Sequence, residues 1–177
     1  MQIDRDDYRV LAWASYSFLQ CGQPISVVNG FIERALELNP GDSVTHWLSG
    51  WVNVFTPDPS KALAAFETGL RLDPHSPWRV VFHGGQGMAL LQLDRFEEAI
   101  PLLGEAEIFP HARSAFGTMQ AAAYGFLGQV KEAQAMAEVR LPLKANDEAY
   151  FDNVRDGSLK TKILEGLRLA AIAPEQK

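Results

Sequence analysis

Two short motifs contain residue types that could do hydrolytic chemistry. His83-Gly84-Gly85-Gln86-Gly87 offers glycine N–H groups of the kind that stabilise an oxyanion, and Gly41-Asp42-Ser43 offers a serine that could act as a nucleophile. Neither motif follows a strand, because the first is expected within a helix and the second in a helix-capping turn. The sequence also contains no Gly-x-Ser-x-Gly elbow. An esterase is therefore only a remote alternative.

The sequence also contains no recognisable metal-binding or cofactor-binding motif. The histidines are not spaced as ligand pairs on one helix face, no carboxylate accompanies them in a known ligand pattern, and Cys21 is the lone cysteine. The glycines near residue 85 do not continue into a phosphate-binding motif. We expect no catalytic residue, no metal site, no cofactor and no enzymatic activity. The four histidines are His46, His75, His83 and His111.

Composition narrows the class of protein further. The 177 residues are 47% hydrophobic and 21% charged, which is ordinary for a globular domain. A net charge of -6 without clustered Lys and Arg argues against a nucleic-acid partner. No apolar run has membrane-spanning length, and the acidic start lacks the basic lead of a signal peptide. We expect a cytoplasmic protein that binds neither nucleic acid nor membrane.

The elements that organise these residues follow a repeat of about 34 to 37 positions, a period typical of stacked helical hairpins. Leu38-Asn39-Pro40 and Leu72-Asp73-Pro74 lie 34 positions apart. Small residues recur along the chain at related spacings; such residues allow two helices to approach closely, whereas proline ends the second helix. The recurring positions are Ser15, Gly22, Ile32, Ala35 and Pro40; Gly50, Ala62, Phe66, Gly69 and Pro74; Gly87, Ala99, Leu103 and Ala106; and Ala121, Ala133 and Ala137.

This spacing resembles the tetratricopeptide repeat (TPR) family over residues 5 to 143. The resemblance implies an all-α fold in which about four helical hairpins stack as a right-handed superhelix, followed by C-terminal capping helices. The repeat region would cover residues 1–143, with copies at about 5–40, 41–74, 75–110 and 111–143. The expected helices lie near 5–21, 24–38, 42–55, 59–72, 76–92, 95–108, 111–127 and 130–143. A capping segment, 144–177, would contain a short helix at 148–154 and an amphipathic helix at 159–171.

The C-terminal end carries a second resemblance. Val154-Arg155-Asp156, followed by Ile163-Leu164-Glu165-Gly166-Leu167-Arg168 and then Ala173-Pro174-Glu175, is similar to the end of TPR tails attached to bacterial adenylate/guanylate cyclases and to some winged-helix transcription regulators. This resemblance implies an alternative function, in which the chain is a C-terminal regulatory or dimerisation segment of a larger protein of that kind.

The TPR resemblance implies protein recognition in a concave groove lined by the first helix of each hairpin. Trp47 and Trp51 lie three positions before and one after Gly50, on the expected groove side of their helix. Corresponding positions in other copies include Tyr16 and Met88, and Trp13 lies beside the same stripe. We therefore expect a non-catalytic scaffold that binds an apolar peptide or helix. Aromatic residues at this spacing could instead belong to the core.

The first helix is apolar on more than one face, although terminal repeats normally present a polar outer face. Val10, Leu11, Phe18 and Leu19 are the apolar residues concerned. They predict an interface, either with a second copy in a homodimer or with an upstream domain.

Overall fold

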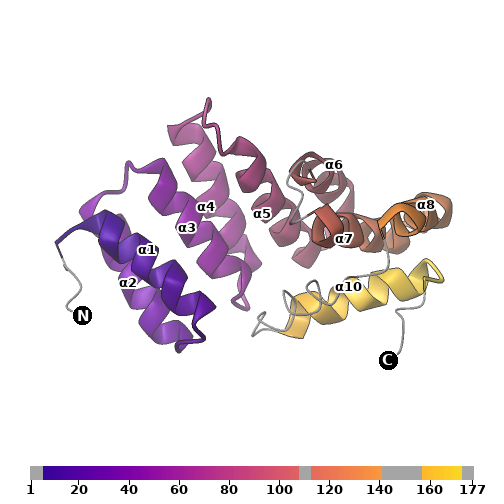
Figure 1. Cartoon of the computed structure of the whole chain (residues 1–177), viewed down its shortest axis with the longest axis horizontal. Coiled ribbons are helices and arrows are strands. Elements are labelled where there is room, and N and C mark those ends of the chain that lie inside the picture. Colours follow the sequence, from indigo (N-terminus) through magenta and orange to yellow (C-terminus); the bar gives the residue numbers. More distant parts are fainter. Residues whose placement is uncertain (1–5, 108–112, 141–156, 173–177) are drawn as a thin grey trace. The chain divides into compact units, whose positions relative to one another are not determined.

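The computed structural model describes residues 6–107, 113–140 and 157–172, and these residues form helices joined by turns (Figure 1). Side chains are described for residues 6–107, 115–136 and 159–172. The short helix expected at 148–154 lies outside the described residues. The helices are α1 (Tyr8–Gln20), α2 (Ile25–Leu38), α3 (Ser43–Val54), α4 (Pro59–Leu72), α5 (Arg79–Gln92), α6 (Phe96–Ala106), α7 (Arg113–Phe126), α8 (Val130–Arg140) and α10 (Gly157–Leu169).

The chain forms two compact units, residues 1–85 and 86–177, called unit 1 and unit 2 below, and the boundary falls inside α5. In unit 1, α1 pairs with α2 and α3 pairs with α4, while α3 also packs against α1 and α2. In unit 2, α7 packs against α6, α8 and α10. The pairs α1–α2, α3–α4 and α7–α8 are hairpins that the repeat predicts, whereas the α2–α3 and α6–α7 contacts join successive hairpins.

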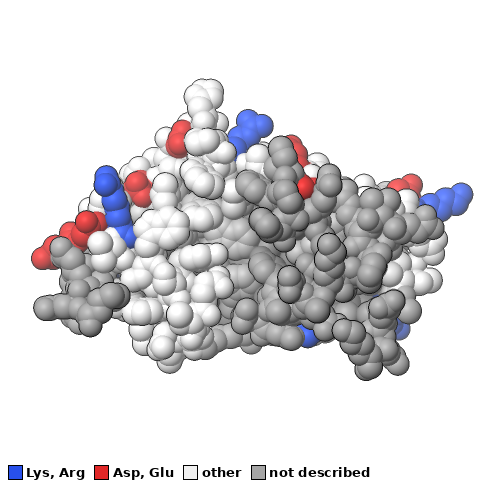
Figure 2. All heavy atoms as spheres, viewed as in Figure 1, with Lys and Arg blue, Asp and Glu red and all other residues white. Residues whose placement is uncertain are grey.

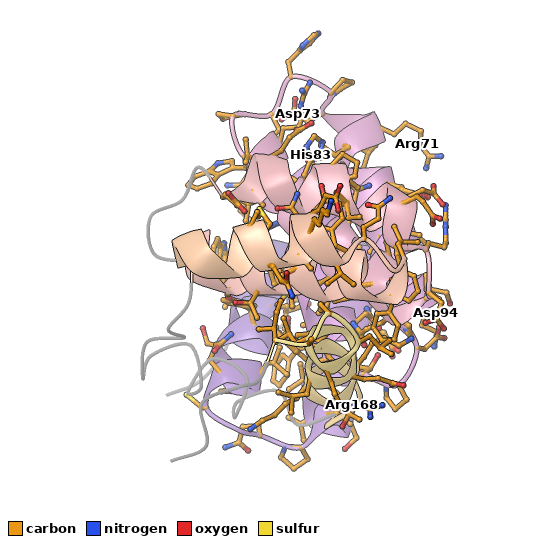
Figure 3. The ribbon with its side chains drawn as sticks, turned by 90° about the vertical axis from the view of Figure 1, so that its right-hand side faces the viewer. Arg71, Asp73, His83, Asp94 and Arg168 are labelled. Carbon is orange, nitrogen blue, oxygen red and sulfur yellow. The ribbon has the colours of Figure 1, made fainter. Side chains whose placement is uncertain are left out.

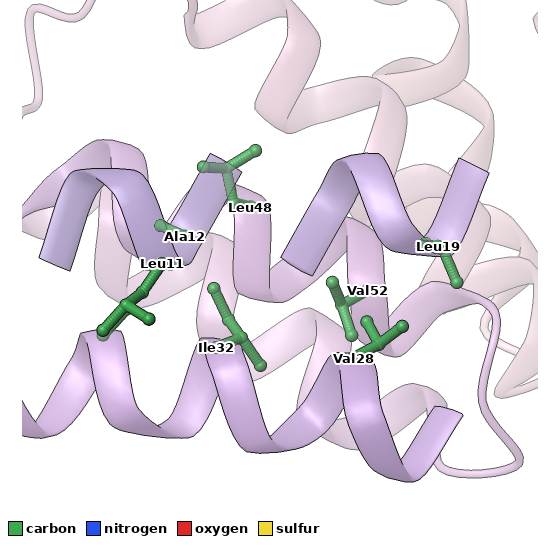
Figure 4. Packing of buried hydrophobic residues seen from close by; sticks show 8 residues of the cluster. Leu11, Ala12, Leu19, Val28, Ile32, Leu48 and Val52 are labelled. Atoms are coloured by element: carbon green, nitrogen blue, oxygen red, sulfur yellow. The ribbon is translucent and has the colours of Figure 1, made fainter. Parts of the chain in front are cut away.

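The first three helices of unit 1 share one apolar core. Figure 4 shows side chains of α1 and α2 meeting between the two helices, with two residues of α3 beside them. The members are at most 8% exposed, so their burial contributes roughly 1.5 to 3 kcal/mol for each large aliphatic side chain. They are Leu11, Ala12, Leu19, Val28, Ile32, Ala35, Leu48 and Val52.

The hairpin seams form where the small-residue pattern places them. A Cβ added at Gly50 would lie 2.5 Å from the ring of Phe66, so only glycine leaves room for that ring. In unit 2 a Cβ at Gly87 would lie 2.7 Å from the Leu103 side chain. Ala62 and Ala99 are fully buried, as the repeat predicts for seam residues.

Local signals explain where several helices begin. Asp42 caps α3, because its carboxylate accepts a hydrogen bond from the Thr45 N–H at 2.7 Å. The fifth helix starts at Arg79 and not near residue 76 as expected. Ser76 precedes Pro77, which disfavours helical backbone there, and its Oγ accepts a hydrogen bond from the Trp78 N–H at 3.3 Å. The extra residues of the third copy therefore form a turn that carries Trp78.

Candidate functional site: an aromatic pocket in unit 1

A pocket of about 230 Å³ lies on unit 1, and residues from three helices and one turn line it. Trp13 comes from α1, and Val44 and Trp47 come from α3. The turn before α5 and the first part of that helix supply the rest, Ser76, Trp78 and Phe82. These six residues are called the aromatic pocket. Five of them have apolar or aromatic side chains, so the pocket suits an apolar group.

Ring contacts hold part of this pocket in place. The Trp13 and Trp47 ring centroids are 6.0 Å apart in an edge-to-face arrangement. Tyr16 supports both rings, at 6.5 Å from Trp13 and 6.2 Å from Trp47. Pairs with this geometry contribute about 0.5–1.5 kcal/mol beyond their buried area. Burial raises the pKa of the Tyr16 phenol, because it disfavours the charged phenolate.

The pocket exposes more aromatic surface than a core would. Trp13 is 49% exposed and Trp78 is 57% exposed, whereas Trp47 is half-buried. On the side of the molecule drawn in Figure 2, the described surface over α1 and α3 is mostly uncharged, and its charged atoms gather toward the edge. A rigid apolar surface of this kind is enriched at binding hot spots.

Two indole groups in unit 1 are unpaired donors. The Nε1 atoms of Trp47 and Trp51 are buried and have no hydrogen-bond partner within the described residues. An unpaired buried N–H costs about 1–3 kcal/mol, which is offset here by the apolar area of each ring. Trp51 packs edge-to-face on Phe66, with centroids 5.9 Å apart.

The structure separates the five groove residues expected from the sequence. Trp13 and Trp47 line the pocket, and Tyr16 supports their rings. Trp51 is only 7% exposed and Met88 is completely buried. Neither offers a surface to a partner in this conformation, because Trp51 belongs to the seam with Phe66 and Met88 lies in the interior.

Sequence reasoning missed four lining residues, Val44, Ser76, Trp78 and Phe82. Phe82 does not lie at any of the offsets from Gly87 that were used to find groove residues, and Trp78 lies in the turn between two copies. One signal could have found Trp78: the chain from Pro74 to Gly87 spans 13 positions, against 10 from Pro40 to Gly50. An insertion that carries an exposed tryptophan beside a groove helix is a sign of a binding loop.

The four residues expected to form an interface on the first helix have different environments. Leu11 and Leu19 are 2% and 8% exposed and belong to the core with α2. The Phe18 ring contacts the Phe31 ring at 5.2 Å between centroids. Val10 is 40% exposed and is the member of the set that faces solvent most. The α2 helix therefore covers much of the apolar surface that suggested a partner.

The two hydrolytic motifs have structural roles in the described residues. Gly85 lies against the Phe66 ring, and Gly87 lies against Leu103, so these glycines provide close packing within α5. The aspartate of the second motif caps α3. In the part of the chain that the structure describes, no group of three or more His, Cys, Asp or Glu side chains could hold a metal ion. Among the described helices, none is long and apolar enough to cross a membrane.

Comparison with known proteins identifies the fold. No protein-family model and no curated protein sequence matches this chain. Among solved structures, Pseudomonas aeruginosa pilF is similar with a TM-score of 0.64 and 19% identity, covering 96% of this chain and 78% of pilF. YrrB, a TPR protein described as having an unusual peptide-binding site, is similar with a TM-score of 0.64 and 19% identity, covering 98% of this chain and 90% of YrrB. The chain therefore has an all-α fold of the TPR type.

Proposed function

We propose that this chain is a protein-interaction module that binds an apolar side chain of a peptide or protein partner in the aromatic pocket of unit 1. The observation that carries this proposal is the exposure of Trp13 and Trp78 around a cavity of about 230 Å³. Contiguous exposed apolar surface marks interaction sites, and tryptophan is enriched among residues that dominate binding energy. The peptide-binding site of YrrB, a protein with a similar fold, supports the same class of function.

The pocket also indicates what kind of partner segment it accepts. Its lining has one polar side chain, Ser76, which already accepts a hydrogen bond from the Trp78 N–H. The pocket therefore lacks the basic side chains that would grip a terminal carboxylate or a phosphate group. A large aliphatic or aromatic anchor residue, flanked by groups that remain in solvent, fits this surface best.

Selection from a random peptide library on the full chain tests this proposal. Enriched peptides should share a large apolar anchor, and Trp78→Ala should weaken their binding by about 2 kcal/mol or more. Trp78 is 57% exposed, so the same change should alter the free energy of unfolding by only about 0.5 kcal/mol. The matched control is Leu72→Ala, which removes an exposed apolar side chain outside the pocket lining. Failure to enrich any peptide, or equal binding by Trp78→Ala and the original chain, would contradict the proposal.

A further inference from the structure

The helix α10 contacts the other helices of unit 2 through a single stripe of its surface. The exposed residues Leu164, Glu165 and Arg168 lie on the remaining surface of the helix. Anchors spaced at three and four positions on one face are the pattern of an amphipathic helix bound in a groove. The buried stripe consists of Leu159, Ile163, Gly166, Leu167 and Ala170.

The α10 backbone lies almost directly on α7. A Cβ added at Gly125 would overlap the carbonyl oxygen of Gly166, and a Cβ added at Gly166 would lie 2.8 Å from the Ala122 Cα. Both helices therefore need small residues at their crossing, since a side chain on either would push them apart. Gln134 of α8 adds one hydrogen bond, from Nε2 to the Ala170 carbonyl oxygen at 3.3 Å.

The side of α7 that receives α10 carries Ala122 and Gly125. Ala121 takes the place of Gly50 in the fourth copy, so Ala122 corresponds to Trp51 in the second. Gly125 lies three residues after Ala122, on the same face of α7. The position that the Trp51 ring fills against Phe66 in unit 1 is therefore covered in unit 2 by the backbone of α10.

A charged contact fixes the position of α10 along this face. The Lys162 Nζ donates hydrogen bonds to the Gln92 carbonyl oxygen at 3.0 Å and to the Asp94 carboxylate at 2.6 Å. Asp94, labelled in Figure 3, lies in the turn that follows α5 and has a φ of 60°. The C-terminal end of α5 carries partial negative charge, which favours a cation there. Through Lys162, α10 therefore contacts the C-terminal end of α5 as well as α7.

The other helices of unit 2 also pack against one another. Leu103 of α6 fills the space beside Gly87 of α5, and α7 packs against both α6 and α8. Ala99 and Ala133 are completely buried. We expect removal of α10 to expose one face of α7 and to leave these contacts between the hairpin helices in place.

We propose that the face of unit 2 formed by Ala122 and Gly125 of α7 and by the end of α5 is a binding site for an amphipathic helix, and that α10 occupies it as an intramolecular ligand. A competing partner must then be a helix with small residues at the crossing and a basic side chain near its start. This surface differs from the aromatic pocket in location and chemistry, so each proposal can fail without the other.

Hydrogen exchange on the full chain carrying Gly166→Leu is the first test. This substitution lies on α10, so the face of α7 that α10 contacts keeps its own residues. Amide exchange in α10 should accelerate roughly 10-fold or more, whereas protection of α7 and α8 should persist. Loss of protection throughout unit 2 would overturn the proposal, because it would show that α10 is an integral part of the core.

A labelled peptide of residues 157–172 gives the second test. It should bind the Gly166→Leu chain at least about 10-fold more tightly than the original chain, where α10 already fills the site. The matched control peptide carries Gly166→Leu and should not bind, and a Lys162→Met peptide should bind more weakly. Equal binding to both chains, or no binding to the folded variant, would overturn the proposal. Light scattering that shows a dimer with exchanged α10 helices would overturn the assignment of α10 as an intramolecular occupant.

Discussion

One position of the repeat is open in unit 1 and closed in unit 2. In unit 1, Trp47 lines an open pocket with Trp13. In unit 2, the position that corresponds to Trp47 is Thr118, which is only 2% exposed, and the backbone of α10 lies against Ala122 one turn further along α7. Residues 115–123 of α7 are all buried, whereas α1 and α3 leave Trp13 and Val44 exposed. Large aromatic side chains therefore accompany the open pocket of unit 1, and small residues accompany the helix-covered face of α7 in unit 2.

The largest expected loss of stability follows from replacing Trp51, the buried tryptophan of unit 1. Trp51→Ala should lower the free energy of unfolding by about 3–5 kcal/mol, because it removes a ring packed on Phe66 from a buried site. Trp13→Ala, at 49% exposure, is the control within the same unit and should cost about 1 kcal/mol or less. Urea unfolding measures both. Similar losses for the two variants would show that unit 1 has no distinction between core and pocket tryptophans.

A matched pair of glycines tests the close contact in unit 2. Gly125→Ala should destabilise the chain by about 1–3 kcal/mol, because the added Cβ overlaps the Gly166 carbonyl oxygen. Gly30→Ala is the control: it places the same methyl group on α2, where no atom lies within 4 Å, and should stabilise by about 0.5–1 kcal/mol. Chemical unfolding compares them. A neutral Gly125→Ala variant would mean that α10 does not lie on α7 as described.

A smaller effect is expected for the charged contact that holds α10. Lys162→Met should cost about 1 kcal/mol or less, since Asp94 is 67% exposed and water screens the pair. The loss should diminish at high salt, because screening already weakens the contact in the original chain. Thermal unfolding at low and high ionic strength checks this. A loss that does not depend on salt would assign the effect to packing of the lysine stem.

The smallest effects concern carboxylates at helix starts, where the two units should behave alike. The Ser60 hydroxyl lowers the pKa of Asp58 in unit 1, and the Arg95 guanidinium lowers the pKa of Glu98 in unit 2. A lowered pKa in the folded state gives stability above the ordinary carboxyl pKa, and that stability is lost as the pH falls through the folded value. Asp58→Asn and Glu98→Gln should therefore differ from the original chain at neutral pH and converge with it in acid. Stability curves from pH 7 to 3 measure this, and a difference that persists in acid would contradict the assigned cause.

Much of the fold could be predicted from the spacing of small residues. Gly50, Ala62 and Phe66 give a seam from sequence alone, because a ring next to a glycine at hairpin spacing has few other places to pack. The offset of Trp47 from Gly50 makes it a candidate for partner binding, and in the structure it lines the aromatic pocket. The burial of Trp51 could not, since offset does not show that Phe66 lies against its ring.

The rest of the candidate site depends on contacts that a repeat pattern does not contain. Trp78 belongs to a turn between copies, so no offset from Gly87 places it beside Trp13. The stripe of α10 that includes Ile163 and Leu167 predicts an amphipathic helix, but periodicity does not show which helix it covers. The position of α10 on α7 depends on Gly125 and Gly166, because neither has a side chain that would keep the two helices apart. These two residues are far apart in the sequence.

The difference between the open aromatic pocket of unit 1 and the face of α7 that α10 covers can be measured without any ligand. A soluble paramagnetic relaxation agent broadens NMR signals of groups that solvent reaches. We expect strong broadening of the Trp13 and Trp78 side-chain signals and little broadening for Trp51 and the Ala122 methyl group, which is completely buried. If the Ala122 methyl signal broadens as strongly as those of Trp13, or if Trp13 and Trp78 are protected, the distinction between the two faces is wrong.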